Sequence, residues 1–262
     1  MSWLMLVRKE LRQNGSLAGL GGVLFFIILV FLIYQVNTNP GNTIFIFMLI
    51  PIILLHFFYM FLMILASMRR EWKEGTVILW LNIPLRGWNL LSAKVTASFI
   101  YFIISLIITM ASFYGLLYYS REIYFQMGIP DFSSLFLEYS GWLFLFIVNG
   151  ALWLGLTGLF IFVVSKVIKP LGWLIAIGIT VGLNFLWSWI TNTAAYETIA
   201  HWETLLTFDQ IAEGLNMDIE GSPLDHLEGL EILHLGHMLI EVGLMVAIFI
   251  GICWLFDKKV EV

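Results

Sequence analysis

Charged residues are scarce in this sequence. Asp, Glu, Lys and Arg make up 12% of its 262 residues, hydrophobic residues make up 60%, and the mean hydropathy is +0.93. Soluble domains contain about 25% charged residues, so this composition excludes an ordinary soluble fold. Residues 13–68 contain no charged side chain, and this stretch is long enough for two membrane spans of about 20 residues each. The sequence therefore predicts an integral membrane protein.

Other chemical features are also missing. The chain has a single cysteine, Cys253, which excludes a disulfide within the chain. It has no G-x-x-x-x-G-K-[ST] motif, so it lacks the loop that holds ATP phosphates in P-loop proteins. We therefore expect no enzymatic activity, no cofactor and no metal in this chain. Its acids are concentrated in the last third, an asymmetry that indicates membrane topology and not nucleic-acid binding.

The apolar residues gather into long segments separated by polar turns. We expect six transmembrane helices, at residues 17–36, 43–67, 95–119, 141–165, 171–190 and 237–256. The predicted fold is an all-α integral membrane protein in which residues 1–262 form a single transmembrane domain. His56 lies in the middle of the second segment, and we expect a neighbouring helix to satisfy its polar ring.

The basic residues predict the orientation of these helices. Lys and Arg in short loops tend to remain on the cytoplasmic side of a membrane. When both termini and the loop at residues 68–94 are placed inside, all 13 Lys and Arg residues except Arg121 lie inside. The sequence therefore predicts a multi-pass protein of the plasma membrane with both termini in the cytoplasm.

Two polar segments are expected at the membrane surfaces. Residues 1–14 combine apolar side chains with Arg8, Lys9 and Arg12, which predicts an amphipathic helix lying flat on the inner surface. The long apolar stretch that follows and the lack of a small-x-small cleavage site argue against a signal peptide. Residues 191–236 contain half of the 18 acids and no Lys or Arg, so we place them outside. Their apolar residues recur at near-helical spacing, which predicts an outer helical segment.

The loop at residues 68–94 is longer than a connection between two helices needs, since such connections have about 2–8 residues. Glu71 and Glu74 would lie in the first turn of a short helix, where carboxylates complement the exposed N–H groups. The apolar run at residues 76–81 is too short to cross a bilayer, and Pro84 ends the helix. This pattern predicts a short helix at the cytoplasmic surface.

The order of residues in this loop resembles the cytoplasmic loop of ABC-2 type exporter permeases. The resemblance consists of charged residues after the second span, then Glu74-Gly75-Thr76, Leu81, Pro84, and Lys94 at the start of the third span. It implies a permease subunit whose coupling helix docks on a separate ATPase subunit, which binds ATP and Mg²⁺. The implied coupling interface consists of Glu71, Glu74, Gly75, Thr76, Leu81 and Pro84. Such a permease would need a second copy or a sibling chain to enclose a pathway.

Other interpretations stay open at this point. The loop could be an ordinary basic loop that anchors two spans. The protein could be an ATP-independent carrier, although the interiors of the first five spans contain no Asp, Glu, Lys or Arg for ion coupling. It could also be a membrane immunity or sensor protein that binds a ligand without transporting it. An intramembrane hydrolase is disfavoured because most His and Glu residues lie outside the apolar segments.

A second group of candidate site residues lies near the start of the last span. Glu231, His234, His237 and Glu241 are spaced by three, three and four residues, which would place them along one face of a helix. Such a face could line an outer vestibule or bind a cation such as zinc. The motif H-E-x-x-H is absent and one helix rarely supplies a complete metal site, so we favour a polar face toward solvent or a partner. Glu241 is the strongest candidate, because it lies about one turn inside the outer end of the span.

Overall fold

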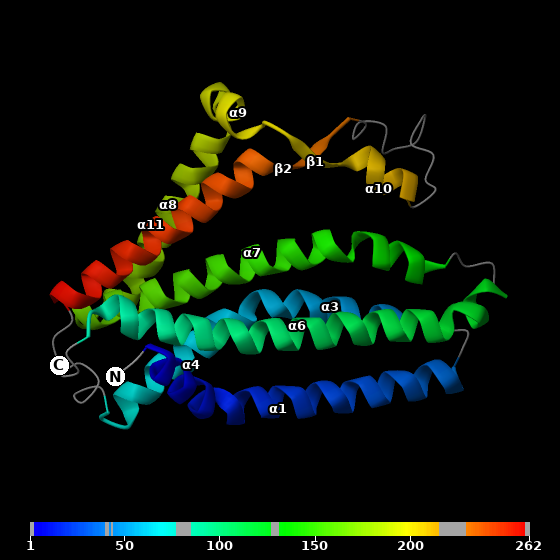
Figure 1. The fold of residues 1–262 in the computed structure, drawn as a ribbon, viewed down its shortest axis with the longest axis horizontal. Coiled ribbons are helices and arrows are strands. Elements are labelled where there is room, and N and C mark those ends of the chain that lie inside the picture. Colours follow the sequence, from blue (N-terminus) through cyan, green and yellow to red (C-terminus); the bar gives the residue numbers. More distant parts are fainter. Residues whose placement is uncertain are drawn as a thin grey trace.

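The structure is a computed structural model that describes residues 3–39, 42, 44–76, 85–126, 131–214 and 229–259. The elements in chain order are α1 (Trp3–Thr38), α2 (Ile44–Phe47), α3 (Leu49–Leu55), η1 (His56–Phe58), α4 (Tyr59–Lys73), α6 (Gly87–Phe125), α7 (Phe132–Val167), α8 (Gly172–Thr191), α9 (Ala194–Ala200), β1 (Thr204–Thr207), α10 (Phe208–Gly214), β2 (Glu231–His234) and α11 (Leu235–Lys259) (Figure 1). Within these described residues, six helical segments are long and apolar enough to cross a membrane. The protein is thus a multi-pass membrane protein with a predominantly helical fold, as the sequence predicts.

The longest helices are α1, α6 and α7; in Figure 1, α6 and α7 run through the middle of the molecule and α1 runs along one side. Helix α6 contacts α1, α4 and α7, and α7 also contacts α8 and α11. The fully buried apolar side chains of this core include Met60, Ile64, Phe102, Leu106, Ile147 and Leu159. By contrast, only 6% of the most apolar stretch of α1, and the same share in α8, is buried within the chain. Their outer faces are therefore apolar and free to contact lipid.

Both ends of the chain lie at one end of the helical bundle, together with the end of α4 and the start of α6 (Figure 1). We call this end of the molecule the terminal end and the other the distal end. Helix α9, the strands and α10 lie away from the terminal end and form a layer over α7. This arrangement separates the two groups of candidate site residues.

Local sequence accounts for several helix ends. Asp131 precedes α7, and its carboxylate accepts hydrogen bonds from the hydroxyl of Ser133 at 2.6 Å and from the Ser133 backbone N–H at 2.9 Å. These hydrogen bonds lower the pKa of Asp131. Helix α4 ends just before Gly75, whose φ of +70° is readily adopted only by glycine. The C-terminal boundary of α4 is therefore set by a glycine that cannot easily be replaced.

The helices extend further than the apolar segments alone. Helix α4 continues to Lys73 and α6 begins at Gly87, so much of the expected loop at residues 68–94 is helical. Glu71 and Glu74 consequently lie at the end of a helix and not in the first turn of one, which corrects the expectation. Residues 77–84, which include Leu81 and Pro84 and most of the expected coupling helix, lie outside the described residues.

The expectation of a separate amphipathic helix at residues 1–14 is also wrong. Residues 3–14 belong to α1, which continues without a break to Thr38. Leu6 and Val7 are buried against the bundle, and so is Glu10, which finds a basic partner there. The physical reason is that Glu10 pairs with Lys94 of α6, so this segment packs against the bundle as the first part of α1.

The segment between α8 and α11 is only partly helical. Short helices α9 and α10 are present, but β1 and β2 pair as antiparallel strands, with Thr204 opposite His234 and Thr207 opposite Glu231. Asp209 on α10 accepts a hydrogen bond from the backbone N–H of Gly229 at 3.1 Å, which joins α10 to the residues before β2. The predicted outer helical segment is therefore corrected to a mixed layer of helix and strand within residues 194–214 and 229–234.

His56 confirms a prediction about the bundle. Its side chain is buried, with Nε2 lying 3.0 Å from the Ser105 hydroxyl on α6 and Nδ1 lying 2.9 Å from the carbonyl oxygen of Ile52. A neighbouring helix thus satisfies the ring, as expected.

Candidate functional site

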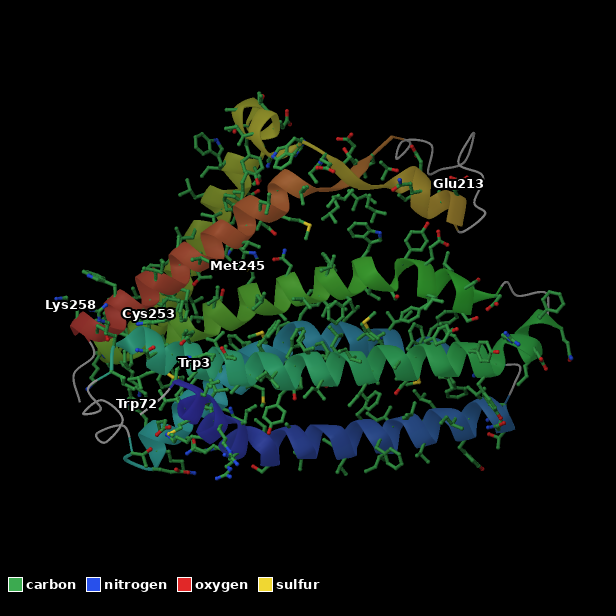
Figure 2. All side chains as sticks on the ribbon, in the orientation of Figure 1. Trp3, Trp72, Glu213, Met245, Cys253 and Lys258 are labelled. Carbon is green, nitrogen blue, oxygen red and sulfur yellow. The ribbon has the colours of Figure 1, made fainter. Side chains whose placement is uncertain are left out.

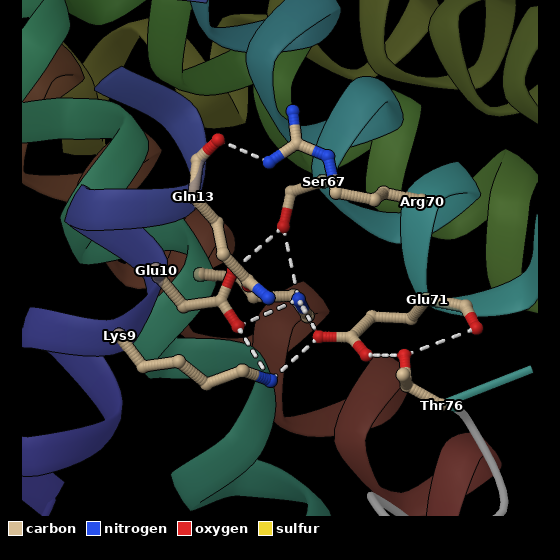
Figure 3. Close-up of polar contacts among 8 residues, drawn as sticks. Lys9, Glu10, Gln13, Ser67, Arg70, Glu71 and Thr76 are labelled. Carbon is tan, nitrogen blue, oxygen red and sulfur yellow. Dashed lines mark hydrogen bonds and ion pairs between the residues drawn. The ribbon is translucent and has the colours of Figure 1, made fainter. Parts of the chain in front are cut away.

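The terminal end of the bundle contains a buried network of charged side chains (Figure 3). Its centre is Lys94 on α6, whose side chain is fully buried. The Lys94 ammonium lies 2.8 Å from a carboxylate oxygen of Glu10 on α1 and 3.4 Å from Glu71 on α4. It also donates to the Ser67 hydroxyl at 2.9 Å, and Ser67 in turn donates to Glu10 at 2.8 Å. One ammonium therefore joins three helices.

Lys9 and Thr76 complete the surroundings of Glu71. The Lys9 ammonium lies 2.8 Å from Glu71, and the Thr76 hydroxyl donates to the second oxygen of the same carboxylate. Arg70, the residue before Glu71 on α4, donates from its guanidinium to the backbone carbonyl of Gln13 on α1 (Figure 3). Two carboxylates thus face two ammonium groups, which balances the charge within the network.

The charged side chains of this network differ in how deeply they are buried, and therefore in how much their stability depends on their partners. The exposed fraction is 2% for both Glu10 and Glu71 and 0% for Lys94, while the Lys9 side chain is 35% exposed. A charge that loses its hydration is stabilised only by close partners and hydrogen bonds. The Lys94, Glu10 and Glu71 side chains therefore hold α1, α4 and α6 at fixed relative positions, whereas Lys9 retains access to water.

The connection between α4 and α6 comprises residues 74–86, and both of its described ends are hydrogen-bonded to the bundle. Thr76 bonds to the buried Glu71, as described above, at the beginning of the connection. At its end, the Asp257 carboxylate of α11 accepts the backbone N–H of Gly87 at 2.7 Å. A side chain at Gly87 would overlap Asp257 and Phe256, so a glycine is required for this contact. The two described ends of this connection are therefore hydrogen-bonded to Glu71 on α4 and to Asp257 on α11.

The predicted coupling residues occupy different environments in this connection. Glu71 is buried in the charge network, Gly75 ends α4, and Thr76 binds Glu71. Glu74 is exposed, and among the described residues it has no ion pair or side-chain hydrogen bond. Of the predicted residues that the structure describes, Glu74 is thus the one whose charge faces solvent and is available to another protein.

The outer group, Glu231, His234, His237 and Glu241, does not lie on one helix face, which corrects the prediction. Glu231 and His234 belong to β2, and only His237 and Glu241 belong to α11. The four residues form two separate pairs: His234 Nε2 lies 3.5 Å from Glu231, and His237 Nε2 lies 3.3 Å from Glu241. Among the described residues, no group of three or more His, Cys, Asp or Glu is arranged to hold a metal ion.

The pair at the start of α11 belongs to a longer chain of polar contacts. Glu241 accepts from the side-chain amide of Asn149 on α7 at 2.6 Å, and His237 Nδ1 lies 2.6 Å from the Tyr196 hydroxyl of α9. If Nε2 of His237 carries its proton toward Glu241, Nδ1 accepts from Tyr196. Burial, followed by the nearby Glu241 charge, raises the pKa of Tyr196. This chain of contacts connects α7, α9 and α11.

The pair on β2 is completed by a second histidine. The rings of His201 and His234 are stacked at 4.2 Å between centroids and are nearly parallel, at 6°. Burial lowers the pKa of His234, and the neighbouring His201 lowers it further, while Glu231 opposes both effects. Nδ1 of His234 is buried without a hydrogen-bond partner among the described residues, so the neutral ring is favoured.

The sequence does contain a signal for the buried network, although not for its partners. Lys94 stands alone as a charge between the apolar residues around it, and Ser98 follows one turn later on the same helix face. Glu10 and Asn14 show the same spacing on α1, and all four side chains are buried. Each helix thus has polar residues four positions apart, but those of α1 lie among cations, so this spacing does not identify the helix that faces α6.

Comparisons with protein-family models, with curated proteins and with solved structures find no match to this chain. Its function must therefore be argued from the sites themselves.

Proposed function

We propose that this protein is the permease subunit of an ATP-driven exporter of the ABC-2 type. In this proposal its helices contribute to the translocation pathway, a second permease copy or sibling chain completes the pathway, and a separate ATPase subunit binds ATP and Mg²⁺. The terminal end faces the cytoplasm, so both termini and the connection at residues 74–86 lie on the side of the ATPase. The outer cluster around Glu241 then faces the exterior as part of a vestibule.

The observation that carries this proposal is that the connection is hydrogen-bonded to the bundle at both of its described ends. A partner that pushes on residues 74–86 acts through Thr76 on the buried network and through Gly87 on Asp257. Packed elements of this kind transmit displacement because their cores do not deform continuously. A connection that only anchored two spans by positive charge would need neither of these hydrogen bonds.

The test is a charge reversal at Glu74, with Leu81→Asp as a second variant in the same connection. Glu74→Arg should weaken co-purification of the ATPase that accompanies the tagged wild-type chain from native membranes, or leave it bound without substrate-stimulated hydrolysis. Contact residues at the centre of an interface typically contribute about 2 kcal/mol or more. Insertion into the membrane should stay normal.

The matched control is Glu122→Arg, which makes the same reversal at an exposed position near the other end of α6. It should leave association and hydrolysis unchanged. An ordinary anchoring loop predicts no loss for Glu74→Arg either, since this variant adds positive charge inside. Normal association and normal stimulated hydrolysis in both Glu74→Arg and Leu81→Asp would overturn the proposal.

Orientation can be tested separately. In a Cys253→Ala background, single cysteines at Asn39 and Glu213 should react with a membrane-impermeant thiol reagent added to intact cells, whereas a cysteine at Lys73 should not. Labelling of the Lys73→Cys variant from outside would show that the terminal end faces the exterior.

An ATP-independent carrier is a second candidate, and the buried network is the observation in its favour. Lys94, Glu10 and Glu71 are ionisable groups that are almost completely buried, and ionisable groups within membrane helices commonly mark ion pathways or proton relays. Transport by the purified chain in vesicles with an ion gradient and no ATPase would favour this candidate. Transport only when the ATPase and ATP are added would exclude it.

A further inference from the structure

The first turns of α1 border an open hollow of about 260 Å³. Its lining side chains come from one stretch of the helix: Met5, Arg8, Lys9, Arg12 and Gln13. Glu10 lies within the same stretch but points into the bundle toward Lys94 (Figure 3). The only acid in this stretch of α1 is thus directed away from the hollow, which is lined by three cationic side chains.

Two of these cations are available for a ligand. Arg8 and Arg12 are spaced by four residues, so their guanidinium groups lie on one face of α1. Neither forms an ion pair or a side-chain hydrogen bond with any residue that the structure describes. Lys9 is engaged with Glu71 at 2.8 Å but remains partly exposed. Two unpaired guanidinium groups side by side repel each other and favour an anion between them.

The apolar neighbours of this hollow indicate which anion it fits. Leu4 and Met5, in the turn before Arg8, are 70% and 59% exposed. Trp3 is partly exposed as well, with its ring N–H bonded to the Ser92 hydroxyl at 2.9 Å. Exposed apolar side chains next to cations are stable where both lie at the boundary between acyl chains and headgroups. A soluble anion would satisfy the arginines but would leave Leu4 and Met5 in water.

We propose that this hollow binds the headgroup phosphate of an anionic phospholipid, with Arg8 and Arg12 as the phosphate ligands. Leu4 and Met5 contact the upper part of the acyl chains. Lys9 lies between the phosphate and the buried Glu71, so an occupied site places a lipid in direct electrostatic contact with the network that joins α1, α4 and α6. The proposal does not depend on the proposed transport function.

The test uses the purified full-length chain in detergent with added lipid, and native mass spectrometry to count the lipids retained. The probe is dioleoyl phosphatidylglycerol, with dioleoyl phosphatidylcholine as the neutral lipid. Each basic residue near an anionic surface contributes an appreciable share of binding, so Arg8→Gln with Arg12→Gln should weaken retention of one phosphatidylglycerol by roughly tenfold or more. Retention of phosphatidylcholine should not change.

The matched control removes the same charge from the same end of the bundle. Arg69 and Lys73 are also spaced by four residues, are exposed near the end of α4 and do not line the hollow. Arg69→Gln with Lys73→Gln should retain phosphatidylglycerol as the wild type does. Equal losses in the two double variants would mean that net charge alone attracts the lipid, and the proposed site would be wrong.

Two further arms separate a lipid from other occupants. Leu4→Ser with Met5→Ser keeps both arginines and should also weaken retention of phosphatidylglycerol. Inorganic phosphate at millimolar concentration should not displace the lipid; displacement, together with unchanged retention in the serine variant, would show that the hollow binds a free anion. If the arginine variant keeps its lipid but loses a protein that co-purifies with the wild type, the surface is a protein contact and the proposal is wrong.

Discussion

The two polar regions of this protein contain similar side chains in opposite surroundings. The network at the terminal end contains Lys94 and Glu10, which are almost completely buried, and each charge is balanced by another. The two outer pairs contain Glu231 on β2, whose side chain is 51% exposed, and His237 on α11, whose side chain is 32% exposed. Charges of the first kind are shielded from water and are stabilised by their close partners, whereas the exposed side chains of the second kind also contact water.

This difference indicates different tasks. Removing one member of the buried network leaves an unbalanced charge in an apolar environment, so the network fixes the positions of α1, α4 and α6. The outer pairs include side chains that keep contact with water, so they suit a surface that meets a ligand or another protein. Figure 2 shows the wider context, with Trp3 and Trp72 near the terminal end and Glu213 far from it. The following predictions test this contrast, beginning with the largest expected effect.

Loss of the central ammonium should be the most damaging single change. Lys94→Met leaves Glu10 without its ammonium partner at 2.8 Å and weakens the balance at Glu71. Breaking a buried pair from one side typically costs about 3–5 kcal/mol. We expect a free energy of unfolding lower by this amount, measured by denaturant titration in detergent micelles.

Two variants serve as controls for this prediction. Lys94→Met combined with Glu10→Gln removes both charges of the pair and should recover part of the lost stability. Lys9→Gln removes a partly exposed ammonium and should cost about 1 kcal/mol or less. If Lys94→Met and Lys9→Gln lower the stability equally, burial does not distinguish the two lysines and the contrast fails.

A close contact between Gly236, at the start of α11, and residues Ala200 and Trp202 gives the second prediction. A methyl group at Gly236 would overlap the Trp202 ring and the carbonyl oxygen of Ala200, whereas Gly243 on the same helix has open space around it. Gly236→Ala should therefore destabilise the layer formed by α9, β1 and β2 by about 1–3 kcal/mol. Gly243→Ala should be neutral or slightly stabilising. Limited proteolysis within residues 194–214 would detect the difference, and equal cleavage of the two variants would contradict it.

The sequence allowed the helices to be predicted much better than their contacts. Apolar segments locate helices such as α8 because a span of about 20 apolar residues has few alternatives. The positions of Lys and Arg then suggest an orientation. Neither signal identifies a partner for Lys94, because Glu10 is distant in the sequence and lies among cations that suggest a surface helix. Only the packing of α1 against α6 brings them together.

The outer residues show a second limit of local patterns. Spacings of three and four residues from Glu231 to Glu241 are compatible with a helix, but β2 ends and α11 begins between His234 and Leu235. Each strand has only four residues, and the two strands are far apart in the sequence. The sequence therefore contains no hairpin turn from which their pairing could be predicted. Tertiary contacts, including the stack of His201 on His234, override the helical pattern here.

Glu241 gives the third prediction, because it is the least exposed acid of the outer group, at 14%. Glu241→Gln keeps an acceptor for Asn149 but removes the charge beside His237. We expect a loss of about 1 kcal/mol in stability, since a hydrogen bond to a charged group is replaced by a neutral one. On the proposed function, substrate-stimulated ATP hydrolysis should also fall while the complex stays assembled.

Asn149→Ala is the control for this variant. It removes the donor to Glu241 and leaves the charge in place, so it should lower stability without abolishing the response to substrate. Unchanged hydrolysis and unchanged stability in Glu241→Gln would leave the vestibule role of Glu241 without support.

The smallest expected effect is a pH dependence of the strand pair. The neighbours that face His234 are His201, Glu231 and His237, and burial together with the two histidines keeps its pKa below the ordinary value of 6.5. A lowered pKa in the folded state means that the unfolded segment binds protons more readily. The stability contributed by the neutral ring is therefore present above pH 6.5 and is lost as the pH falls below it toward the pKa of the folded state. Amide hydrogen exchange in β1 and β2, corrected for intrinsic rates, should show more frequent opening at pH 5.5 than at pH 7.5.

His201→Phe keeps a stacked ring without a second titrating group, so it should reduce this acid-induced opening, whereas Lys9→Gln in the other region should not alter it. Equal protection of the strands at the two pH values would show that His234 does not titrate differently in the folded protein.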